Sequence, residues 1–339
     1  MKLTLSRVLP CALTLSLSVL LAACATPSMK ESSVSILVDF DPASVDRTLI
    51  IENLTADRNG VLFMGDRVTG NILRVDPKSP TPVVVARVEA RDVQGKRVNA
   101  DPSGLAFDAQ GDLYVGAGQF GEVVRVRAAD LNPAKPGLAQ TWATGTPGAN
   151  GIAFDRQGNL FVSGGASGIV YRVGASGGAA QPAAQIEKFV RTLPDGKTQQ
   201  AIVANGLAFD AQGVMHVADT ARGAVWKVTL GADGKGAAPV LLAQNPMLEG
   251  ADGLAFDKAG RVWVAANELN AIVAVTPAGA VQSVARNGNA GPLEFPSALV
   301  FVGDVAYVSN FDVPRRDNLD ATGVTAKGGV GASVAMIKP

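Results

Sequence analysis

The sequence predicts an all-β protein, a six-bladed β-propeller with four antiparallel strands in each blade. The main observation is a short motif that recurs six times at intervals of 45 to 55 residues, each copy followed by an apolar strand. A propeller blade is a repeat of about this length. The composition agrees, because 38 glycines and many Val-rich runs favour short strands and tight turns over a helical bundle.

Charge and cysteine content exclude several classes of function. The 339 residues include 30 Lys and Arg against 30 Asp and Glu, so we expect no nucleic-acid partner, which would require a basic surface. Two cysteines cannot form a disulfide framework or a four-ligand zinc site, and a single histidine excludes most histidine-based metal sites. We expect a monomer.

The first 23 residues have the features of an export signal. Lys2 and Arg7 precede an apolar run, Val8–Ala23, that is too short and too often interrupted to span a membrane. The run ends in Leu21-Ala22-Ala23-Cys24, which resembles a bacterial lipobox and predicts cleavage before Cys24 and a lipid on its sulfur. The alternative is ordinary signal cleavage, which also fits the small residues around Cys24.

The chain therefore divides into a signal peptide (1–23), a tether (24–32) and a propeller (33–339). We expect the mature protein to lie in the cell envelope and to face the periplasm, where only its N-terminal lipid contacts the membrane. If ordinary cleavage occurs, the protein is instead soluble in the periplasm or secreted.

Each copy of the motif joins two strands through a tight turn. The six copies are Glu52–Asp57, Ser103–Asp108, Asn150–Asp155, Asn205–Asp210, Asp252–Asp257 and Ser297–Val302, of which the last lacks the aspartate. The aspartate can bond its own backbone, and the glycine three residues later can take a positive φ. The second strands then pair back at Leu62–Met64, Leu113–Val115, Leu160–Val162, Met215–Val217, Val262–Val264 and Ala306–Val308.

Two further strands complete each predicted blade. The third strands are expected at Asn71–Val75, Glu122–Val126, Ile169–Val173, Ala224–Val228 and Ala271–Val275. Fourth strands are expected at Val83–Val88, Lys188–Thr192, Val240–Ala243 and Val281–Ala285. An open four-stranded sheet cannot bury both of its faces alone, so we expect six such sheets to close into a ring.

Ring closure accounts for both ends of the propeller. Blade six has two inner strands and a third at Ala332–Ile337, but no fourth strand follows. Ser33–Phe40 is the candidate for this strand, so the first strand would fasten the last blade. Phe311–Gly331 is an insert in the same blade, and we interpret it either as a solvated loop or as a lid over one face.

One position of the repeat holds most of the expected chemistry. It is the first residue of each motif copy, and around the ring it reads Glu52, Ser103, Asn150, Asn205, Asp252 and Ser297. In a propeller the innermost strands line the axis, so these six side chains should face one central channel. Two carboxylates buried near each other are costly unless a cation offsets their repulsion.

Four of these residues therefore predict a metal site made of oxygen ligands: Glu52, Asn150, Asn205 and Asp252. Hard oxygen donors without sulfur or imidazole favour Ca²⁺, with Mn²⁺, Mg²⁺ and Zn²⁺ as alternatives. The competing interpretation is that Asn and Asp at the start of the motif are only turn-forming residues.

Two motifs point to a known family. Asn205–Asp210 is followed by Val217–Thr220, and Asp252–Asp257 is followed by Val262–Ala265. With these motifs the chain resembles the senescence marker protein, gluconolactonase and luciferin-regenerating enzyme family of six-bladed propellers, whose relatives include diisopropyl fluorophosphatase and paraoxonase. The resemblance implies a divalent metal in the channel, held by the four residues named above, and hydrolysis of a lactone or related ester.

The chain departs from that family in places. Asn53-Leu54 follows Glu52 where the family has Gly-Pro, and the segment before Asn150 lacks the arginine that sugar-lactone enzymes use on their substrate. Both departures argue against an aldonolactone substrate. His216 fills a position that is aromatic in the other blades, so we interpret it as a packing residue and not as a base.

The resemblance also suggests a mechanism. The metal would polarise an ester or lactone carbonyl, and Asp252 would serve as general base or nucleophile. The candidate substrate contacts at the same mouth are Ser103, Asp219, Asn267, Ser297 and Asn310, together with Asp66. The alternative function is a non-catalytic, envelope-anchored propeller that binds a ligand or protein partner and uses the metal structurally.

Overall fold

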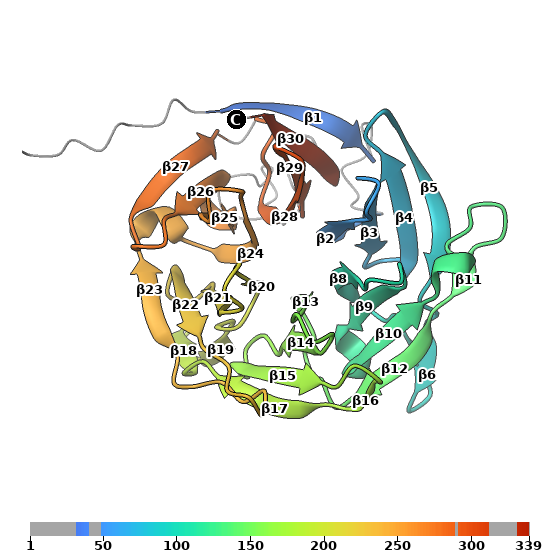
Figure 1. Cartoon of the computed structure of the whole chain (residues 1–339), viewed down its shortest axis with the longest axis horizontal. Coiled ribbons are helices and arrows are strands. Elements are labelled where there is room, and N and C mark those ends of the chain that lie inside the picture. Colours follow the sequence, from blue (N-terminus) through green and yellow to red (C-terminus); the bar gives the residue numbers. More distant parts are fainter. Residues whose placement is uncertain (1–31, 41–48, 289–290, 312–330, 339) are drawn as a thin grey trace, which may run out of the picture.

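The computed structural model describes residues 32–40, 49–288, 291–311 and 331–338. Within these residues six sheets are arranged as a ring around a common axis, which confirms the predicted six-bladed propeller (Figure 1). The all-β class is also confirmed. The helices among the described residues are short 3₁₀ turns at Gly118–Phe120, Ala128–Asp130, Pro246–Leu248 and Asn267–Leu269.

Each blade is an antiparallel sheet of four strands, which are named in order from the axis outward. Blade one contains β2 (Ile51–Ala56), β3 (Leu62–Asp66), β4 (Asn71–Asp76) and β5 (Ser79–Arg87). Blade two contains β8 (Pro102–Phe107), β9 (Leu113–Ala117), β10 (Glu122–Val126) and β12 (Gln140–Thr144). Blade three contains β13 (Ile152–Phe154), β14 (Leu160–Ser163), β15 (Ile169–Val173) and β17 (Gln181–Gln185).

The second half of the ring repeats this order. Blade four contains β20 (Leu207–Phe209), β21 (Met215–Asp219), β22 (Ala224–Val228) and β23 (Val240–Gln244). Blade five contains β24 (Ala251–Phe256), β25 (Val262–Ala266), β26 (Ala271–Val275) and β27 (Val281–Arg286). Blade six contains β28 (Pro296–Val302), β29 (Val305–Asn310), β30 (Ser333–Lys338) and β1 (Ser33–Asp39).

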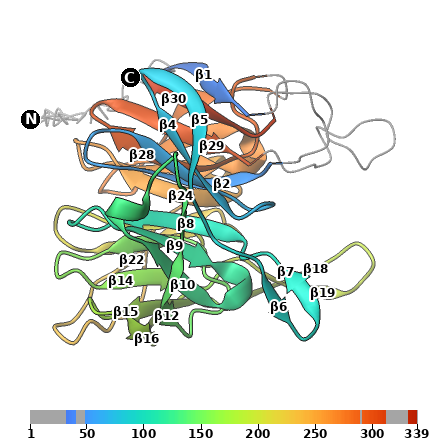
Figure 2. The same cartoon turned by 90° about the vertical axis from the view of Figure 1, so that its right-hand side faces the viewer.

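Some short strands do not belong to the four-stranded blades. β11 (Gly137–Leu138) and β16 (Gly178–Ala179) pair in parallel with the outer strands of blades one and two. Two hairpins extend from one face of the ring, and they are β6–β7 (Arg91–Val93 and Lys96–Val98) and β18–β19 (Phe189–Thr192 and Thr198–Ala201) (Figure 2).

The prediction of a fourth strand at Lys188–Thr192 was wrong. Residues of that segment form β18 of the projecting hairpin, and the outer strand of blade three is β17. Strand β17 contributes only one buried side chain to the core, that of Ala183, whereas the outer strands β5 and β27 each contribute two. The β17 sequence Gln-Pro-Ala-Ala-Gln therefore lacks the apolar pattern of an inner strand, and Pro182 is tolerated because the strand is an edge.

Blade six combines segments from the two ends of the described chain. β1 pairs antiparallel with β30, with Val34 opposite Ile337 and Asp39 opposite Ser333, so β1 is the outer strand of this blade (Figure 1). Side chains of blade six and blade one also share one buried cluster, in which Tyr307 and Val334 lie with Leu62.

Hydrophobic clusters hold the ring together, with one between each pair of neighbouring blades. Within them, the ring of a second strand packs edge to face on the motif phenylalanine of the next blade. The pairs are Phe63–Phe107, Tyr114–Phe154, Phe161–Phe209, His216–Phe256 and Trp263–Phe301. The interpretation of His216 as a packing residue is therefore confirmed, and its burial lowers the pKa of the imidazole.

The motif turns have the predicted geometry. The side chain of Asp210, for example, accepts bonds from the backbone N–H groups of Gln212 and Val214, at 2.8 and 2.9 Å. Gly213 follows with a φ of +82°. The sixth copy lacks this aspartate and turns instead at Gly303, which has a φ of +64°.

The glycines near the start of the motif allow neighbouring innermost strands to approach closely. A Cβ at Gly206 would lie 2.6 Å from the Cα of Gly253, and a Cβ at Gly253 would lie 2.5 Å from the Cα of Ala298. Gly151 has the same relation to Gly206, at 3.0 Å. Side chains at these positions would push the strands apart, so the narrow axis depends on glycine.

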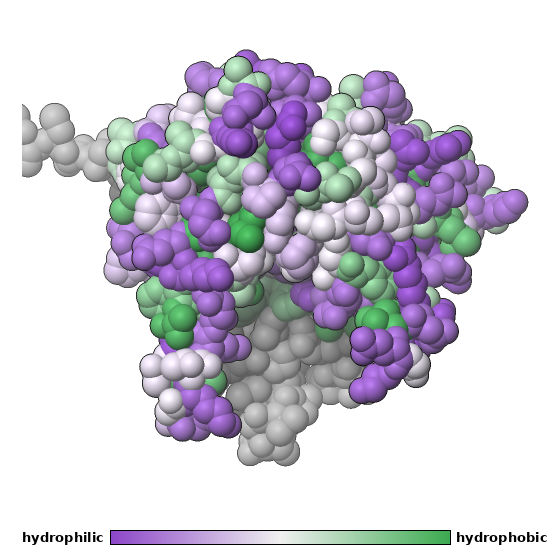
Figure 3. All heavy atoms as spheres, turned by 90° about the horizontal axis from the view of Figure 1, so that it is seen from below, coloured by the Kyte–Doolittle hydropathy of each residue, from purple (hydrophilic) through white to green (hydrophobic). Residues whose placement is uncertain are grey.

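Several sequence predictions fall outside the described residues. They are the export signal, Cys24 with its lipid, all of the tether but Ser32, and residues 312–330 of the insert, and they stay predictions. Among the residues that the structure describes, no helix is long and apolar enough to cross a membrane. The described residues on the side shown in Figure 3 mix hydrophilic and hydrophobic side chains in small areas.

We expect Gly206→Ala to lower the free energy of unfolding by about 1–3 kcal/mol, the usual cost of overpacking. Its Cβ would overlap the backbone of Asp252 and Gly253 in the next blade. Denaturant unfolding measures the change. Gly174→Ala is the control, because a Cβ there has no atom within 4 Å. Equal costs for the two substitutions would contradict the argument from close approach.

We expect deletion of residues 331–339 to abolish cooperative thermal unfolding, because β1 and β29 would both lose their partner β30. Calorimetry of the truncated chain measures this. Replacing the β6–β7 hairpin by a short turn is the control, since that hairpin belongs to no blade. A truncated protein that melts like the full chain would show that β1 and β30 do not fasten the ring.

Candidate functional site

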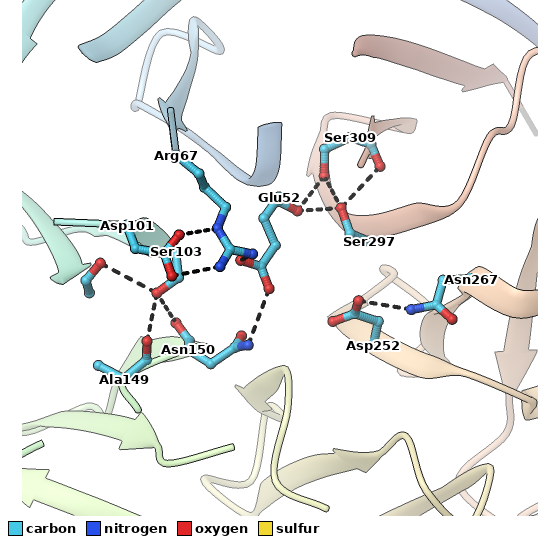
Figure 4. Close-up of polar contacts among 11 residues, drawn as sticks. Glu52, Arg67, Asp101, Ser103, Ala149, Asn150, Asp252, Asn267, Ser297 and Ser309 are labelled. Atoms are coloured by element: carbon cyan, nitrogen blue, oxygen red, sulfur yellow. Dashed lines mark hydrogen bonds and ion pairs between the residues drawn. The ribbon is translucent and has the colours of Figure 1, made fainter. Parts of the chain in front are cut away.

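Three of the six first-position residues of the motif, Glu52, Asn205 and Asp252, line one cavity, whereas Ser103, Asn150 and Ser297 do not. Glu52 and Asp252 lie on β2 and β24, whereas Asn150 and Asn205 come just before β13 and β20. Glu52, Asn150 and Asp252 project toward one central space (Figure 4). A cavity of about 530 Å³ opens there and is lined by Glu52, Asn205 and Asp252, together with Asn267.

The two carboxylates of the site are almost fully buried. Glu52 is 8% exposed and Asp252 is 7% exposed. Burial raises the pKa of Asp252 well above its ordinary value, and the charge of Glu52 raises it further. Burial also raises the pKa of Glu52, although the nearby Arg67 opposes that effect. A cation near both carboxylates would favour their ionised forms.

Amide side chains orient these carboxylates. Asn267 Nδ2 donates to Asp252 Oδ2 at 3.1 Å, and Asn150 Nδ2 donates to Glu52 Oε1 at 3.2 Å (Figure 4). Asn267 is the first residue of a 3₁₀ turn after the second strand of blade five. Of the predicted substrate contacts, Asn267 is therefore the one that the structure brings to the cavity.

Asn205 has an oxygen that is buried and without a hydrogen-bond partner among the described residues. Its Nδ2 donates to Thr220 Oγ1 at 2.9 Å, and that hydroxyl donates to the carbonyl of Ala251 at 2.7 Å. Since the nitrogen is held in this way, Asn205 Oδ1 is left for another partner. An unsatisfied buried oxygen beside two carboxylates fits a hard divalent cation.

The donor set also limits which metals suit the site. Among the described residues no three His, Cys, Asp or Glu side chains gather, so a metal would rely on Glu52, Asp252 and neutral amide oxygens. Such ligands suit Ca²⁺ or Mg²⁺ better than Zn²⁺, which prefers nitrogen and sulfur. Of the predicted metal ligands, Glu52, Asn205 and Asp252 line the cavity and have the oxygen donors that such an ion prefers, whereas Asn150 does not line the cavity and its amide donates to Glu52.

The structure adds a charged pair that the sequence analysis missed. Arg67 lines the cavity, and its NH1 donates to Glu52 Oε2 at 2.6 Å. Its Nε and NH2 bind both carboxylate oxygens of Asp101, the second at 2.6 Å. Burial disfavours the charge of Arg67, but the two carboxylates together outweigh it and raise the pKa, so the guanidinium stays charged. The sequence did contain a hint of this residue. Arg67 directly follows Asp66, which was predicted to lie at the mouth of the central channel.

Other predicted contacts make structural bonds instead. Asp66 accepts from the backbone N–H of Ile50 and Val68, and Asp219 binds Arg222 and the indole N–H of Trp226. Asn310 bonds the backbone of Glu294 and Pro292. None of these three predicted residues lines the cavity.

The two serines at the first position of the motif, Ser103 and Ser297, connect neighbouring blades. Ser103 Oγ donates to the carbonyl of Ala149 at 2.8 Å, and Ser297 Oγ donates to the carbonyl of Glu52 (Figure 4). Ser309 Oγ donates to the same carbonyl at 2.9 Å. The serines therefore fix the backbone around the metal-ligand candidates rather than facing the cavity.

The β18–β19 hairpin contributes to the rim of the cavity. Phe189 and Arg191 come from its first strand and Gln199 from its second. The guanidinium of Arg222 lies 5.1 Å from the centre of the Phe189 ring, and Phe295 and Phe311 lie at another part of the rim. The rim thus combines aromatic rings with polar side chains.

Comparisons with known proteins support the resemblance inferred from the motifs. Residues 173–307 match the model of the SMP-30/Gluconolactonase/LRE-like region. This match includes Asn205 and Asp252 but begins after Glu52 and Asn150 in the chain. No curated protein matches the sequence.

Solved structures of similar fold extend over most of the chain. A gluconolactonase from Xanthomonas campestris is 16% identical, with a TM-score of 0.62, and covers 91% of this chain and 89% of its own. A luciferin-regenerating enzyme is 15% identical, with a TM-score of 0.62, over 91% and 95%. A calcium-binding regucalcin from Agrobacterium tumefaciens is 16% identical, with a TM-score of 0.60, over 91% and 95%. At these identities the likeness shows the fold.

We expect the metal-free protein to lose stability as the pH rises above 3.8, the ordinary pKa of Asp252. Because the folded state raises this pKa, it keeps a proton that the unfolded state releases, so the free energy of unfolding falls through the raised pKa. Denaturation in chelator at several pH values measures the slope.

Asp252→Asn should reduce that slope and raise the neutral-pH stability of the metal-free protein, since the amide carries no charge. The pKa of Glu52 is also raised, so the free energy of unfolding of the variant should still fall in part as the pH rises. Identical pH profiles for the wild type and the variant would show that Asp252 is not a strained carboxylate.

Proposed function

We propose that this protein is a metal-dependent hydrolase of a lactone or related ester, with the reaction at the central cavity. The observation that carries the proposal is the unpartnered Oδ1 of Asn205, which lines the same cavity as the buried carboxylates Glu52 and Asp252. The gluconolactonase-like match over residues 173–307 supports the reaction class.

The proposed site divides its tasks among a few residues. Glu52, Asn150, Asn205 and Asp252 would hold a divalent cation, with Ca²⁺ as the first candidate. Such an ion supplies a Lewis acid that polarises a carbonyl and lowers the pKa of water bound to it. No sulfur or imidazole ligand is required for this chemistry.

Asp252 is the proposed general base. Its burial makes the carboxylate a stronger base than an exposed aspartate, which favours removal of a proton from an attacking water. Asn267 holds one carboxylate oxygen by its Nδ2–H and thereby fixes the orientation of the group. The guanidinium of Arg67 lines the same cavity and offers N–H donors near the reacting carbonyl.

The aromatic part of the rim bears on the substrate. Phe189, Phe295 and Phe311 lie around the opening, and rings favour an apolar or aryl group over a fully hydroxylated sugar. This agrees with the absence of the arginine that sugar-lactone enzymes use. We propose a lactone or ester with an apolar portion.

A second candidate is a non-catalytic propeller that binds a ligand or partner at this mouth. The ion pair between Arg67 and Glu52 favours it, because it compensates one carboxylate without any metal. In that case a bound metal would serve stability alone, and a panel of aryl and alkyl lactones and esters would show no turnover.

We expect Asp252→Asn to abolish turnover of that panel and to weaken Ca²⁺ binding, because it removes a charge and the base. Asn205→Ala removes a ligand but no base, so excess Ca²⁺ should restore part of its activity. Saturating metal stabilises the folded state by about 2.7 kcal/mol at a hundredfold excess over Kd, so chelator should lower the wild-type melting temperature.

The control is Asp219→Asn, which alters a fully buried carboxylate that is bonded to Arg222 and Trp226 and does not itself line the cavity. It should reduce stability but leave Ca²⁺ affinity unchanged. If chelator does not change wild-type melting and elemental analysis finds no divalent ion, the metal site is refuted.

A further inference from the structure

Arg67 occupies a fixed position at the edge of the cavity. It directly follows β3, and its backbone N–H donates to the carbonyl of Ile50 at 3.0 Å. Asp66 holds the adjoining turn through the N–H groups of Ile50 and Val68. The side chain is three-quarters covered, and its guanidinium carbon lies 5.2 Å from the centre of the Phe311 ring. This arginine is therefore held in place and is not a free surface charge.

The guanidinium divides its donors between two carboxylates. Asp101 takes the Nε and NH2 donors with both of its oxygens, and Glu52 takes the NH1 donor with one oxygen. Asp101 has a φ of +57°, a conformation that aspartate tolerates better than most residues. The bidentate pair with Asp101 is the stronger of the two contacts.

Both oxygens of Glu52 are consequently in use. Oε2 accepts from Arg67, and Oε1 accepts from Asn150. Asn205 Oδ1, by contrast, has no partner among the described residues. A divalent ion entering the cavity would find this amide oxygen open, but it would meet Glu52 already paired with a cation. Two positive charges would then share one carboxylate at close range, which is unfavourable.

We infer that Arg67 is a built-in cation that competes with the divalent ion for Glu52, and that Asp101 is the partner that retains the guanidinium when the ion binds. The inference rests on the proposed metal site. It assigns the pair a role in setting metal affinity: Arg67 compensates the buried carboxylate without metal, and Asp101 limits how strongly Arg67 opposes the ion.

A positioning role for Arg67 predicts the opposite result. If the arginine held Glu52 ready as a ligand, its removal would weaken metal binding. Competition predicts tighter binding, because Glu52 Oε2 is freed and a positive charge is removed. The geometry favours competition, since the NH1 donor binds the carboxylate oxygen itself rather than a group behind it.

The experiment is calorimetric titration of chelator-stripped protein with Ca²⁺ alone. Arg67→Gln should bind Ca²⁺ about tenfold more tightly than wild type, which corresponds to about 1.4 kcal/mol. Asp101→Asn leaves the guanidinium to Glu52 alone, so it should bind Ca²⁺ more weakly than wild type. The opposite directions of the two changes distinguish competition from a general loss of structure.

Arg91→Gln is the matched control. Arg91 also pairs with a glutamate, Glu122, at 2.9 Å and lies 4.5 Å from the centre of the Phe120 ring, but it does not line the cavity. Its Ca²⁺ affinity should equal that of the wild type. The melting temperature provides a second readout. Without metal, Arg67→Gln should melt at a lower temperature than wild type, and Ca²⁺ should raise its melting temperature by more than it raises that of wild type.

The outcomes separate this inference from the proposed function. Equal or weaker Ca²⁺ binding by Arg67→Gln, with wild type binding normally, overturns the inference and leaves the metal site standing. Binding by Arg67→Gln alone supports the inference, and binding by none of the proteins overturns both. If Arg67→Gln does not fold, Arg67→Met, which also removes the positive charge from Glu52, takes its place and should bind Ca²⁺ more tightly than wild type; no rise in affinity refutes competition.

Discussion

The close approach of the innermost strands at the axis is the constraint on which the rest of the structure depends. Gly206 and Gly253 allow backbones of neighbouring blades to lie nearly in contact, and a Cβ at either position would collide with the next strand. This approach narrows the ring, so the residues that precede these glycines, Asn205 and Asp252, are carried to the same cavity. A wider ring would keep the same blades but would separate the side chains that could bind one ion.

The narrow axis brings two buried carboxylates close together, which is electrostatically unfavourable. The protein compensates each of them with a different kind of group. Burial disfavours the ionised forms of Glu52 and Asp252, and their mutual repulsion adds to the effect for Asp252. Arg67 compensates Glu52 with a full positive charge, whereas Asp252 accepts a hydrogen bond from the neutral amide of Asn267. The charge is therefore balanced on one side of the cavity and unbalanced on the other, which is where a second cation would gain most.

Most of the fold could be predicted from the sequence because each blade repeats the same motif, turn and apolar second strand. The aspartate turns and the second strands follow from residues close together in the chain, and the packing of His216 follows from its position in the repeat, which is aromatic in the other blades. The outer strand β17 and the pairing of Arg67 with Asp101 could not be predicted in this way. β17 buries only Ala183 and lacks the apolar run that the outer strands β5 and β23 have, and Arg67 meets Asp101 only through the packing of two different blades.

The first residue of the motif has two different roles around the ring. This difference explains why the charged groups lie on some sides of the cavity and not on others. Where it is serine, the short side chain bonds the backbone of the neighbouring blade, as Ser297 does with the carbonyl of Glu52. Where it is Glu, Asn or Asp, the longer side chain is available to bond other groups at the axis. Because Ser297 and Ser309 both hold the backbone of Glu52, these two serines of blade six fix the one carboxylate that Arg67 and a metal would share. Residues that contact no substrate thus determine where the charge of the site lies.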